Sequence, residues 1–223
     1  RREEKRREEK RRGIALSPIL IEAVNIMIKI LKAKDPQTLN HQKRVANLCM
    51  RIAKEMGFPD EKAKVLFLSG LIHDIGKLVV PSEILAKPGK LTKEEFETIK
   101  IHPEVGYKIL KGLKFPLTIA EIVYQHHERL NGSGYPRELK NEEILFEARI
   151  LAVADVVEAM STPRPYREAL KIDIVIEEEI LKNSGILYDP EVVKVCFDLY
   201  KGKKLENFLE RELSEEEILN LLQ

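Results

Sequence analysis

The stretch LFLSGLIHDIGK, residues 66–77, decides the fold prediction. It continues an apolar helix that we predict over residues 61–72, and it runs directly into His73 and Asp74. An apolar helix that ends in His-Asp places an imidazole and a carboxylate at one point. That mixture of ligands suits a first-row divalent metal, whereas an all-cysteine site would indicate structural zinc. The stretch therefore predicts a helix that delivers metal ligands at its end.

Helical signals continue on both sides of this stretch. The start and stop signals are Ser17-Pro18, Gly57, Thr92 with Glu95, Pro103, Gly112, Asp189-Pro190, and Ser214 with Glu217. Residues 117–128 and 145–160 are also predicted helices, and KLVVP at 77–81 is the nearest candidate for a strand. We therefore predict an all-α domain, with long loops around residues 79–90 and 129–144 where binding residues tend to lie.

Charge is unevenly distributed along the 223 residues. Residues 1–12, RREEKRREEKRR, carry eight positive and four negative side chains, and the remainder carries 30 positive and 33 negative ones. A body with that slight acidic excess is not expected to bind a nucleic acid polymer. The first twelve residues are interpreted either as a solvated helix or frayed tail, or as the end of a signalling helix from an upstream domain.

Two cysteines and one apolar segment bear on the compartment. Cys49 and Cys196 lie far apart among apolar residues, so we predict reduced, buried thiols and a cytoplasmic protein. The longest apolar stretch, residues 19–31, is too short to span a bilayer and contains Glu22 and Asn25. The sequence begins without Met, and we expect it to be part of a longer protein.

The histidines and one aspartate are the other candidates for chemistry. The five histidines are His41, His73, His102, His126 and His127. Asp155 lies within ILAVADVVEAM, where a carboxylate is costly unless it is paired or bound to metal. Each has an ordinary alternative: a polar helix position or helix junction for the histidines, and an ion pair with Arg149 or a distant lysine for Asp155. Their joint occurrence at helix ends and faces favours a shared metal site.

The order of these residues resembles that of a known superfamily. His41, His73-Asp74 and Asp155 resemble the HD metal-dependent phosphohydrolases. The segments HDIGKLVVPSEILAKPGKLTKEEF, IKIHPEVGYKIL, HHERLNGSGYP and ARILAVADVVEAMSTPRPYREAL are similar, in order, to its HD-GYP branch. The resemblance covers roughly residues 35 to 200. Members of that branch are all-α cyclic di-GMP phosphodiesterases, usually attached to sensor or receiver domains.

The resemblance implies a centre for two divalent metals. One metal would be held by His41, His73, Asp74 and Asp155, and Asp74 would bridge to a second metal held by His102, His126 and His127. The pair would hold a bridging hydroxide that attacks phosphorus in line, with the ribose 3′ oxygen leaving. Iron or manganese is expected most, with cobalt, nickel or zinc as alternatives.

The resemblance also implies residues for catalysis and substrate binding. Asp74 and Lys77 would be catalytic, with Lys77 touching the scissile phosphate, and Tyr135 would lie against the substrate. Arg164 and Arg167 resemble the basic pair of the family, suited to a second phosphate or a guanine edge. The ordinary alternatives are an exposed surface position for Lys77 and a structural salt bridge for the arginines.

Three positions depart from the pattern. Gln37 stands where some members have a glutamate that binds a third metal, so we predict two metals. Asn131 replaces the more usual aspartate of the glycine loop and tolerates the same turn with one charge fewer. Pro163 replaces the acid that commonly precedes RPYR, which leaves the placement of Arg164 open.

Together, the sequence signals and the resemblance predict an HD-superfamily helical bundle with an N-terminal helical extension. We predict three parts: residues 1–34 as a charged segment and the helix leading into the domain, 35–205 as the HD-GYP domain, and 206–223 as a C-terminal helix. The expected activity is hydrolysis of cyclic di-GMP to pGpG, and slowly on to GMP. The alternatives are a different cyclic nucleotide substrate or a sensor of cyclic di-GMP without turnover. The charged segment predicts an upstream sensory or receiver domain, or a contact in a homodimer.

Overall fold

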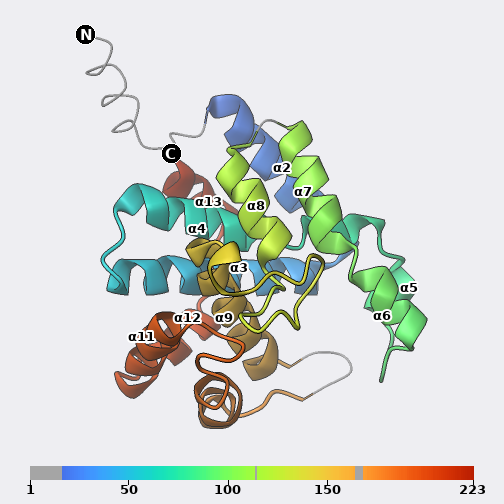
Figure 1. The fold of residues 1–223 in the computed structure, drawn as a ribbon. Helices are drawn as coiled ribbons and strands as arrows, with labels where there is room; N and C mark the ends of the chain where they lie inside the picture. The colour runs from blue at the N-terminus through green and yellow to red at the C-terminus, as the bar shows by residue number, and fades with distance from the viewer. Residues whose placement is uncertain (1–16, 114, 164–167) are drawn as a thin grey trace.

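Helices build the parts of the chain that the computed structural model describes, which are residues 17–113, 115–163 and 168–223 (Figure 1). The elements are α2 (Pro18–Lys34), α3 (Pro36–Glu55), α4 (Asp60–Ile72), the 3-10 helix η1 (Ile75–Val79), α5 (Ser82–Leu85), α6 (Lys93–Ile99), α7 (His102–Gly112), α8 (Leu117–Gln125), the 3-10 helix η2 (Asn141–Glu143), α9 (Phe146–Ser161), α10 (Ile172–Ile174), the π-helix η3 (Val175–Leu181), α11 (Pro190–Lys201), α12 (Leu205–Glu210) and α13 (Glu215–Leu222). Within those ranges there is no strand, and β-type pairing is limited to two isolated bridges. The predicted all-α class is confirmed.

The core is built around α3, α4 and α9. Figure 1 shows α3 and α4 lying across the middle of the molecule, where they pack along each other, while α9 contacts both. Leu48, Ile52, Phe67 and Val153 are fully buried at these contacts. Burial of each such side chain contributes about 1.5–3 kcal/mol. This rigid centre matters for function because three of its helices carry candidate ligands.

The predicted helix ends follow the sequence signals closely. Ser17 accepts a hydrogen bond from the Leu20 amide at the start of α2, and Asp189 accepts from the first turn of α11. Thr92 with Glu95, and Ser214 with Glu217, form the predicted capping boxes. Side-chain acceptors at these positions satisfy amides that the helix leaves without a partner, which is why the signals are readable from sequence.

Two local predictions are corrected. The helix predicted over residues 117–128 ends at Gln125, so His126 and His127 lie in the turn that follows it. The segment KLVVP is not a strand, since Lys77 to Val79 close the 3-10 helix η1. In both places the chain turns inward to bring polar side chains to one site, and tertiary contacts override local propensity.

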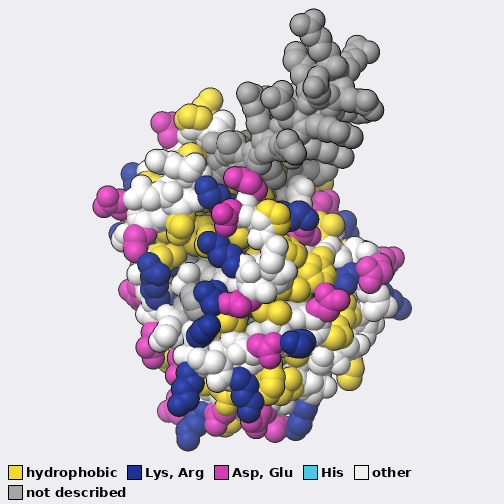
Figure 2. Space-filling view, turned by 90° about the vertical axis from the view of Figure 1, so that its left-hand side faces the viewer, with side chains coloured by type: hydrophobic (Ala, Val, Ile, Leu, Met, Phe, Trp, Pro, Cys, Tyr) yellow, Lys and Arg dark blue, Asp and Glu magenta, His cyan; other side chains and the backbone are white. Residues whose placement is uncertain are grey.

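The structure also bears on the sequence expectations for the cysteines, for membrane-spanning helices and for surface charge. Cys49 and Cys196 are buried, free thiols, as predicted, and burial raises the pKa of Cys196 to about 12. No helix within the described ranges is long and apolar enough to cross a membrane. The charged segment before Ser17 lies outside the described residues. Figure 2 shows one face of the molecule, on which acidic and basic side chains are intermingled.

Candidate metal centre

The structure brings together all seven residues predicted as metal ligands. α3 carries His41, the end of α4 leads into His73 and Asp74, His102 begins α7, the turn after α8 holds His126 and His127, and α9 carries Asp155. Their ligand atoms form two groups, and within each group the atoms lie within 4.8 Å of one another. One group contains His41, His73 and Asp155, and the other contains Asp74, His102, His126 and His127. Five separate segments therefore converge on one place.

Asp74 lies between the two groups, and each of its oxygens faces a different one. Oδ2 lies 3.6 Å from Nε2 of His73 and 3.9 Å from Nε2 of His41. Oδ1 lies 3.2 Å from Nε2 of His102 and 3.9 Å from Nε2 of His126. On the first side Asp155 completes the set, with Oδ1 3.0 Å from Nε2 of His41. This is the arrangement that a carboxylate shared between two cations requires.

Helix ends fix the orientation of three imidazoles. The Nδ1 atoms of His73, His102 and His126 each lie 2.6–2.7 Å from the backbone oxygen of the residue three positions earlier. These oxygens belong to the last turns before each histidine and can only accept, so Nδ1 carries the proton. Nε2 is then left with its lone pair directed into the site, which is the form in which imidazole binds a metal.

Electrostatics favour a positive charge in this site. Burial would raise the pKa of Asp74, but the ammonium of Lys77 and the neighbouring imidazole of His73 outweigh it and hold that pKa well below its usual range. Burial also holds the pKa values of His126 and His127 well below that of a free imidazole. For His41, burial lowers the pKa, yet the neighbouring Glu158 and Asp155 raise it overall. The site therefore combines ionised carboxylates with the neutral imidazoles of His126 and His127, a combination that attracts a cation.

Two buried polar atoms without a hydrogen-bond partner indicate whether the residues of this site fit a metal ion. Nε2 of His73 and Oδ1 of Asp74 are buried and have no hydrogen-bond partner. Unsatisfied buried polar atoms are costly, and native structures rarely keep them without a ligand or ion. The donor set is imidazole nitrogen and carboxylate oxygen, the set preferred by first-row divalent metals. The residues present fit a metal centre.

Arg149, one of the alternative partners considered for Asp155, is engaged elsewhere. Arg149 lies 3.0 Å from Asp189 and 3.3 Å from Glu142, and these contacts occupy it away from the site. Burial would raise the pKa of Asp155, but the neighbouring imidazoles of His41 and His73 outweigh burial and hold that pKa well below its usual range. The ionic partners of Asp155 are therefore the imidazoles of the candidate centre, and Arg149 is not one of them.

Lys77 and Gly76 tie the 3-10 helix η1 to the centre. The Lys77 ammonium lies 2.6 Å from Oδ2 of Asp74 and is partly buried, so it is not an exposed surface lysine. Gly76 lies against the start of α7, where an added Cβ would stand 1.9 Å from the backbone oxygen of His102. Only glycine permits this approach, which places Asp74 beside His102. The catalytic role of Lys77 stays a prediction.

The glycine loop packs its backbone against the two adjacent histidines. A Cβ on Gly134 would lie 2.4 Å from the His127 oxygen and 2.5 Å from the Arg129 nitrogen. Tyr135 follows, and its ring stacks on His127 with centroids 4.7 Å apart. The buried Glu128 carboxylate accepts the backbone amides of Arg137 at 2.8 Å and Leu139 at 2.9 Å. The loop therefore holds His127 in place; the predicted contact of Tyr135 with substrate remains a prediction.

Glu158 is a buried acid at the centre that the sequence reading missed. It lies one turn after Asp155 on α9, and its side chain is fully buried. One oxygen contacts Nδ1 of His41, and the other accepts from Nε of Arg44 at 2.7 Å. Burial opposes ionisation, but His41 and Arg44 hold the pKa of Glu158 at about 2. A carboxylate behind a metal-binding imidazole orients the ring and increases its basicity. The signal was its three-residue spacing from Asp155 in an apolar helix.

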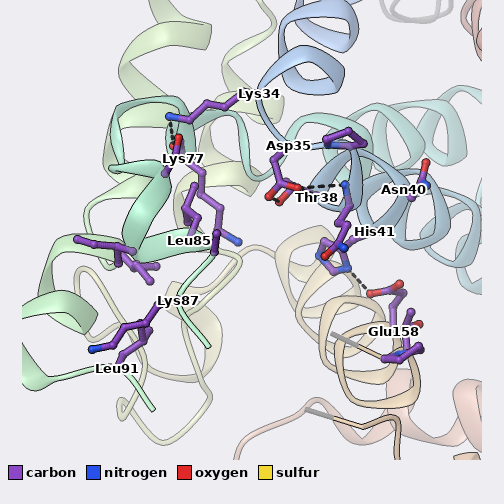
Figure 3. A pocket seen from close by; sticks show the side chains of 18 of the residues that line it. Lys34, Asp35, Thr38, Asn40, His41, Lys77, Leu85, Lys87, Leu91 and Glu158 are labelled. Atoms are coloured by element: carbon purple, nitrogen blue, oxygen red, sulfur yellow. Dashed lines mark hydrogen bonds and ion pairs between the residues drawn. The ribbon is translucent and has the colours of Figure 1, made fainter. Parts of the chain in front are cut away.

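A cavity of about 810 Å³ opens beside the centre (Figure 3). Its lining includes Lys77, Lys87 and Leu91 on one side and His41 and Glu158 on the other, and Phe96 also lines it. Figure 3 shows Lys77 and His41 pointing toward the same space from opposite walls. Gln37, Thr162 and Pro163 also line it. Arg164 and Arg167, the predicted basic pair, lie outside the described residues.

Comparisons with known proteins agree with this geometry. The chain is 40% identical over 199 residues to a cyclic di-GMP phosphodiesterase of Thermotoga maritima, covering 88% of the chain and 53% of that protein. It is 36% identical over 174 residues to the cyclic di-GMP phosphodiesterase response regulator RpfG of Xanthomonas campestris, covering 77% and 46%. It is 42% identical over 151 residues to a 3′3′-cGAMP-specific phosphodiesterase 1 of Vibrio cholerae, covering 68% and 35%. The chain thus spans about half, or less, of these relatives.

Solved structures show the same fold. Bd1817, described as an HDG"Y"P protein from Bdellovibrio bacteriovorus, superposes with a TM-score of 0.65 at 21% identity, covering 85% of this chain and 67% of that one. The cyclic GMP-AMP phosphodiesterase V-cGAP3 of Vibrio cholerae gives a TM-score of 0.60 at 19% identity, covering 92% and 52%. At these identities the likeness supports the arrangement of the helices.

Fold and site together define a helical bundle whose helices and helix ends converge on two adjacent clusters of histidine and aspartate. A family model described as "HD domain" matches residues 25–192. The chain belongs to the HD domain family, and the resemblance to its HD-GYP branch drawn from the sequence is confirmed by the relatives named above.

Proposed function

We propose that this chain is a metal-dependent phosphodiesterase that hydrolyses cyclic di-GMP to pGpG. The observation that carries the proposal is the position of Asp74, whose two oxygens face two separate groups of imidazoles. Relatives with this name at 36–40% identity support the substrate. Slow further hydrolysis to GMP is part of the proposal.

Two divalent metals would be held as the sequence predicted. His41, His73, Asp74 and Asp155 would bind one, and Asp74, His102, His126 and His127 the other. Bound there, divalent cations supply an activated water at neutral pH and neutralise charge on phosphorus. Iron or manganese suits this mixture of imidazole and carboxylate best, with cobalt, nickel or zinc as alternatives.

The side chains around the centre would bind and orient the substrate. Lys77 lies at the cavity wall within reach of Asp74, and its ammonium would contact the scissile phosphate. The cavity volume of about 810 Å³ lies within the usual range for pockets that bind small-molecule ligands and cofactors. Arg164 and Arg167 would approach from the segment that follows Pro163, and Tyr135 would support the substrate from the glycine loop.

A second substrate has a specific observation in its favour. A relative that is 42% identical is named a 3′3′-cGAMP-specific phosphodiesterase. The metal ligands determine the reaction class far better than they determine which base is bound, so 3′3′-cGAMP is the main competing substrate. A cyclic di-GMP sensor without turnover is the alternative outside enzymes.

The remaining proposals concern the whole protein. The division at residues 34 and 205, an upstream sensory or receiver domain, a homodimer contact through the charged segment and a cytoplasmic location are kept as proposals. The partial coverage of the relatives supports the idea of further domains.

The test combines metal content with turnover. Protein purified with and without oxygen is assayed for metal by mass spectrometry and for hydrolysis of cyclic di-GMP, 3′3′-cGAMP and cyclic di-AMP. About two metals per chain with pGpG as product would support the proposal. Two metals with faster turnover of 3′3′-cGAMP would select the competing substrate, and two metals without turnover would favour the sensor. Protein that takes up no metal under either condition would contradict the proposal.

A further inference from the structure

Lys34 and Asp35 form the junction between α2 and α3 at the edge of the cavity (Figure 3). The Asp35 amide donates to the Leu31 oxygen at 2.8 Å and so ends α2. Its carboxylate accepts the amides of Gln37 at 3.0 Å and Thr38 at 3.2 Å, and so begins α3. One residue therefore closes the first helix and opens the helix that carries His41.

The Lys34 ammonium binds the backbone of the segment that carries Lys77. Its Nζ donates to the backbone oxygens of Lys77 at 3.3 Å, Leu78 at 2.5 Å and Val80 at 3.0 Å. These oxygens lie at or just after the C-terminal end of η1, where backbone carbonyls carry partial negative charge, and the Lys77 oxygen also accepts the Val80 amide at 3.0 Å. An ammonium has three N–H donors, and all three are used here. Although Lys34 lines the cavity, its donors are directed into the protein.

The junction therefore touches both elements that meet at the first ligand group. η1 follows Asp74 directly, and within it Lys77 lies 2.6 Å from Oδ2 of Asp74. α3, which Asp35 caps, carries His41, whose Nε2 lies 3.9 Å from the same oxygen of Asp74.

The position of Lys34 is itself fixed by α2. Val24, Ile28 and Leu31 of this helix are buried in the core. Because Lys34 is the last residue of this packed helix, its ammonium is held in place before any ligand binds. The geometry is that of a support rather than a flexible substrate contact.

We propose that Lys34 is a positioning residue that holds η1 against the start of α3 and so keeps Asp74 and Lys77 in register with His41. The inference rests on the metal role proposed above and is independent of which cyclic dinucleotide is the substrate. It assigns to the end of α2 a part in assembling the centre.

The test compares Lys34→Met with Lys32→Met in the full chain. Both changes keep a long side chain and remove one ammonium two residues apart on α2, but only Lys34 contacts η1. Hydrogen exchange of residues 74–80, measured without metal, is expected to be about tenfold faster in Lys34→Met. Affinity for Mn²⁺, measured by titration calorimetry, is expected to fall about tenfold or more. In active protein kcat should fall while KM stays near the wild-type value. Lys32→Met should match wild type in all three.

Two results would overturn the inference. One is exchange and Mn²⁺ affinity in Lys34→Met equal to those of Lys32→Met. The other is a rise in KM alone, which would make Lys34 a substrate contact. If Lys34→Met does not unfold cooperatively, Lys34→Gln takes its place, since the amide keeps two donors; it should show smaller shifts in the same direction, and wild-type exchange in it would equally overturn the inference. Because exchange is read without metal or substrate, it stands even if cyclic di-GMP proves not to be hydrolysed.

Discussion

The Nε2 atoms of His102 and His126 lie 3.2 Å apart, although one ring begins α7 and the other follows α8. Both rings use Nδ1 to donate to a backbone oxygen, so both Nε2 atoms present lone pairs to each other. Two acceptors at hydrogen-bond distance repel unless a proton or a cation lies between them. Asp74 Oδ1, 3.2 Å from His102, adds a negative charge at the same point. This arrangement is stable with a cation and strained without one.

Removal of metal is therefore expected to destabilise the fold. A ligand bound only to the folded state at 100 times its dissociation constant adds about 2.7 kcal/mol, which for a chain of this size corresponds to roughly 5–10 °C in Tm. Thermal unfolding of chelator-treated protein, with and without added Mn²⁺, measures the difference. An identical Tm in both samples would show that no structural metal site exists here.

Asp155→Ala should lose metal and activity together. The substitution removes the carboxylate that pairs with His41 at 3.0 Å and leaves the first ligand group, His41 and His73, without its own anion, so that only Asp74 and Glu158 remain beside it. We expect metal content to fall by about one ion per chain and hydrolysis to fall by two orders of magnitude or more, on the scale of lost catalytic groups. The control is Asp198→Ala, an exposed acid that pairs with Lys194 on α11. Full activity with metal retained in Asp155→Ala would refute the ligand assignment.

Glu158→Gln should weaken the first metal site without unfolding the protein. The amide keeps the size of the side chain but removes the charge that orients His41 and pairs with Arg44. Changes behind a metal-binding histidine typically cost about 10–100-fold in metal affinity. Titration with Mn²⁺ measures the loss, and Glu147→Gln, on the same helix and 3.7 Å from Lys62, serves as the control. Equal affinities in the two variants would mean that Glu158 has no part in the site.

Gly134→Ala should disturb His127 through the backbone. The new methyl group would overlap backbone atoms of residues 127–129, so the loop has to move. Overpacking of this kind costs about 1–3 kcal/mol, and we expect a matching loss in urea stability together with weaker metal binding. Gly112→Ala is the matched control, since its added methyl group would meet nothing within 4 Å. Unchanged stability and metal affinity in Gly134→Ala would show that the loop does not support His127.

Much of this centre could be predicted because ligands and caps are local signals. Ser17, Thr92, Asp189 and Ser214 act within one helical turn, so the sequence alone places the helix starts. The seven candidate ligands could be grouped because their order resembles a family.

Residues whose partners are distant in sequence could not be found in this way. Glu158 meets His41 across 117 positions, and Lys34 meets Val80 across 46. Nothing in the residues around Lys34 distinguishes it from Lys32, which points to another helix. The end of α8 was misplaced by three residues for the same reason, since the turn at His126 is made by the site and not by a local helix breaker.

Because both thiols are buried, the rate at which each reacts with a labelling reagent reports how often its helix opens. Cys49 lies on α3, the helix that begins at Asp35 and carries His41, while Cys196 lies on α11. Only the thiolate reacts with thiol reagents, and burial raises the pKa of both groups, so neither reacts until its helix opens to water. The labelling rate of Cys49 therefore measures how often α3, the helix that carries His41, opens to solvent. Separate rates at the two cysteines would reveal whether that helix opens alone or only when the whole bundle does.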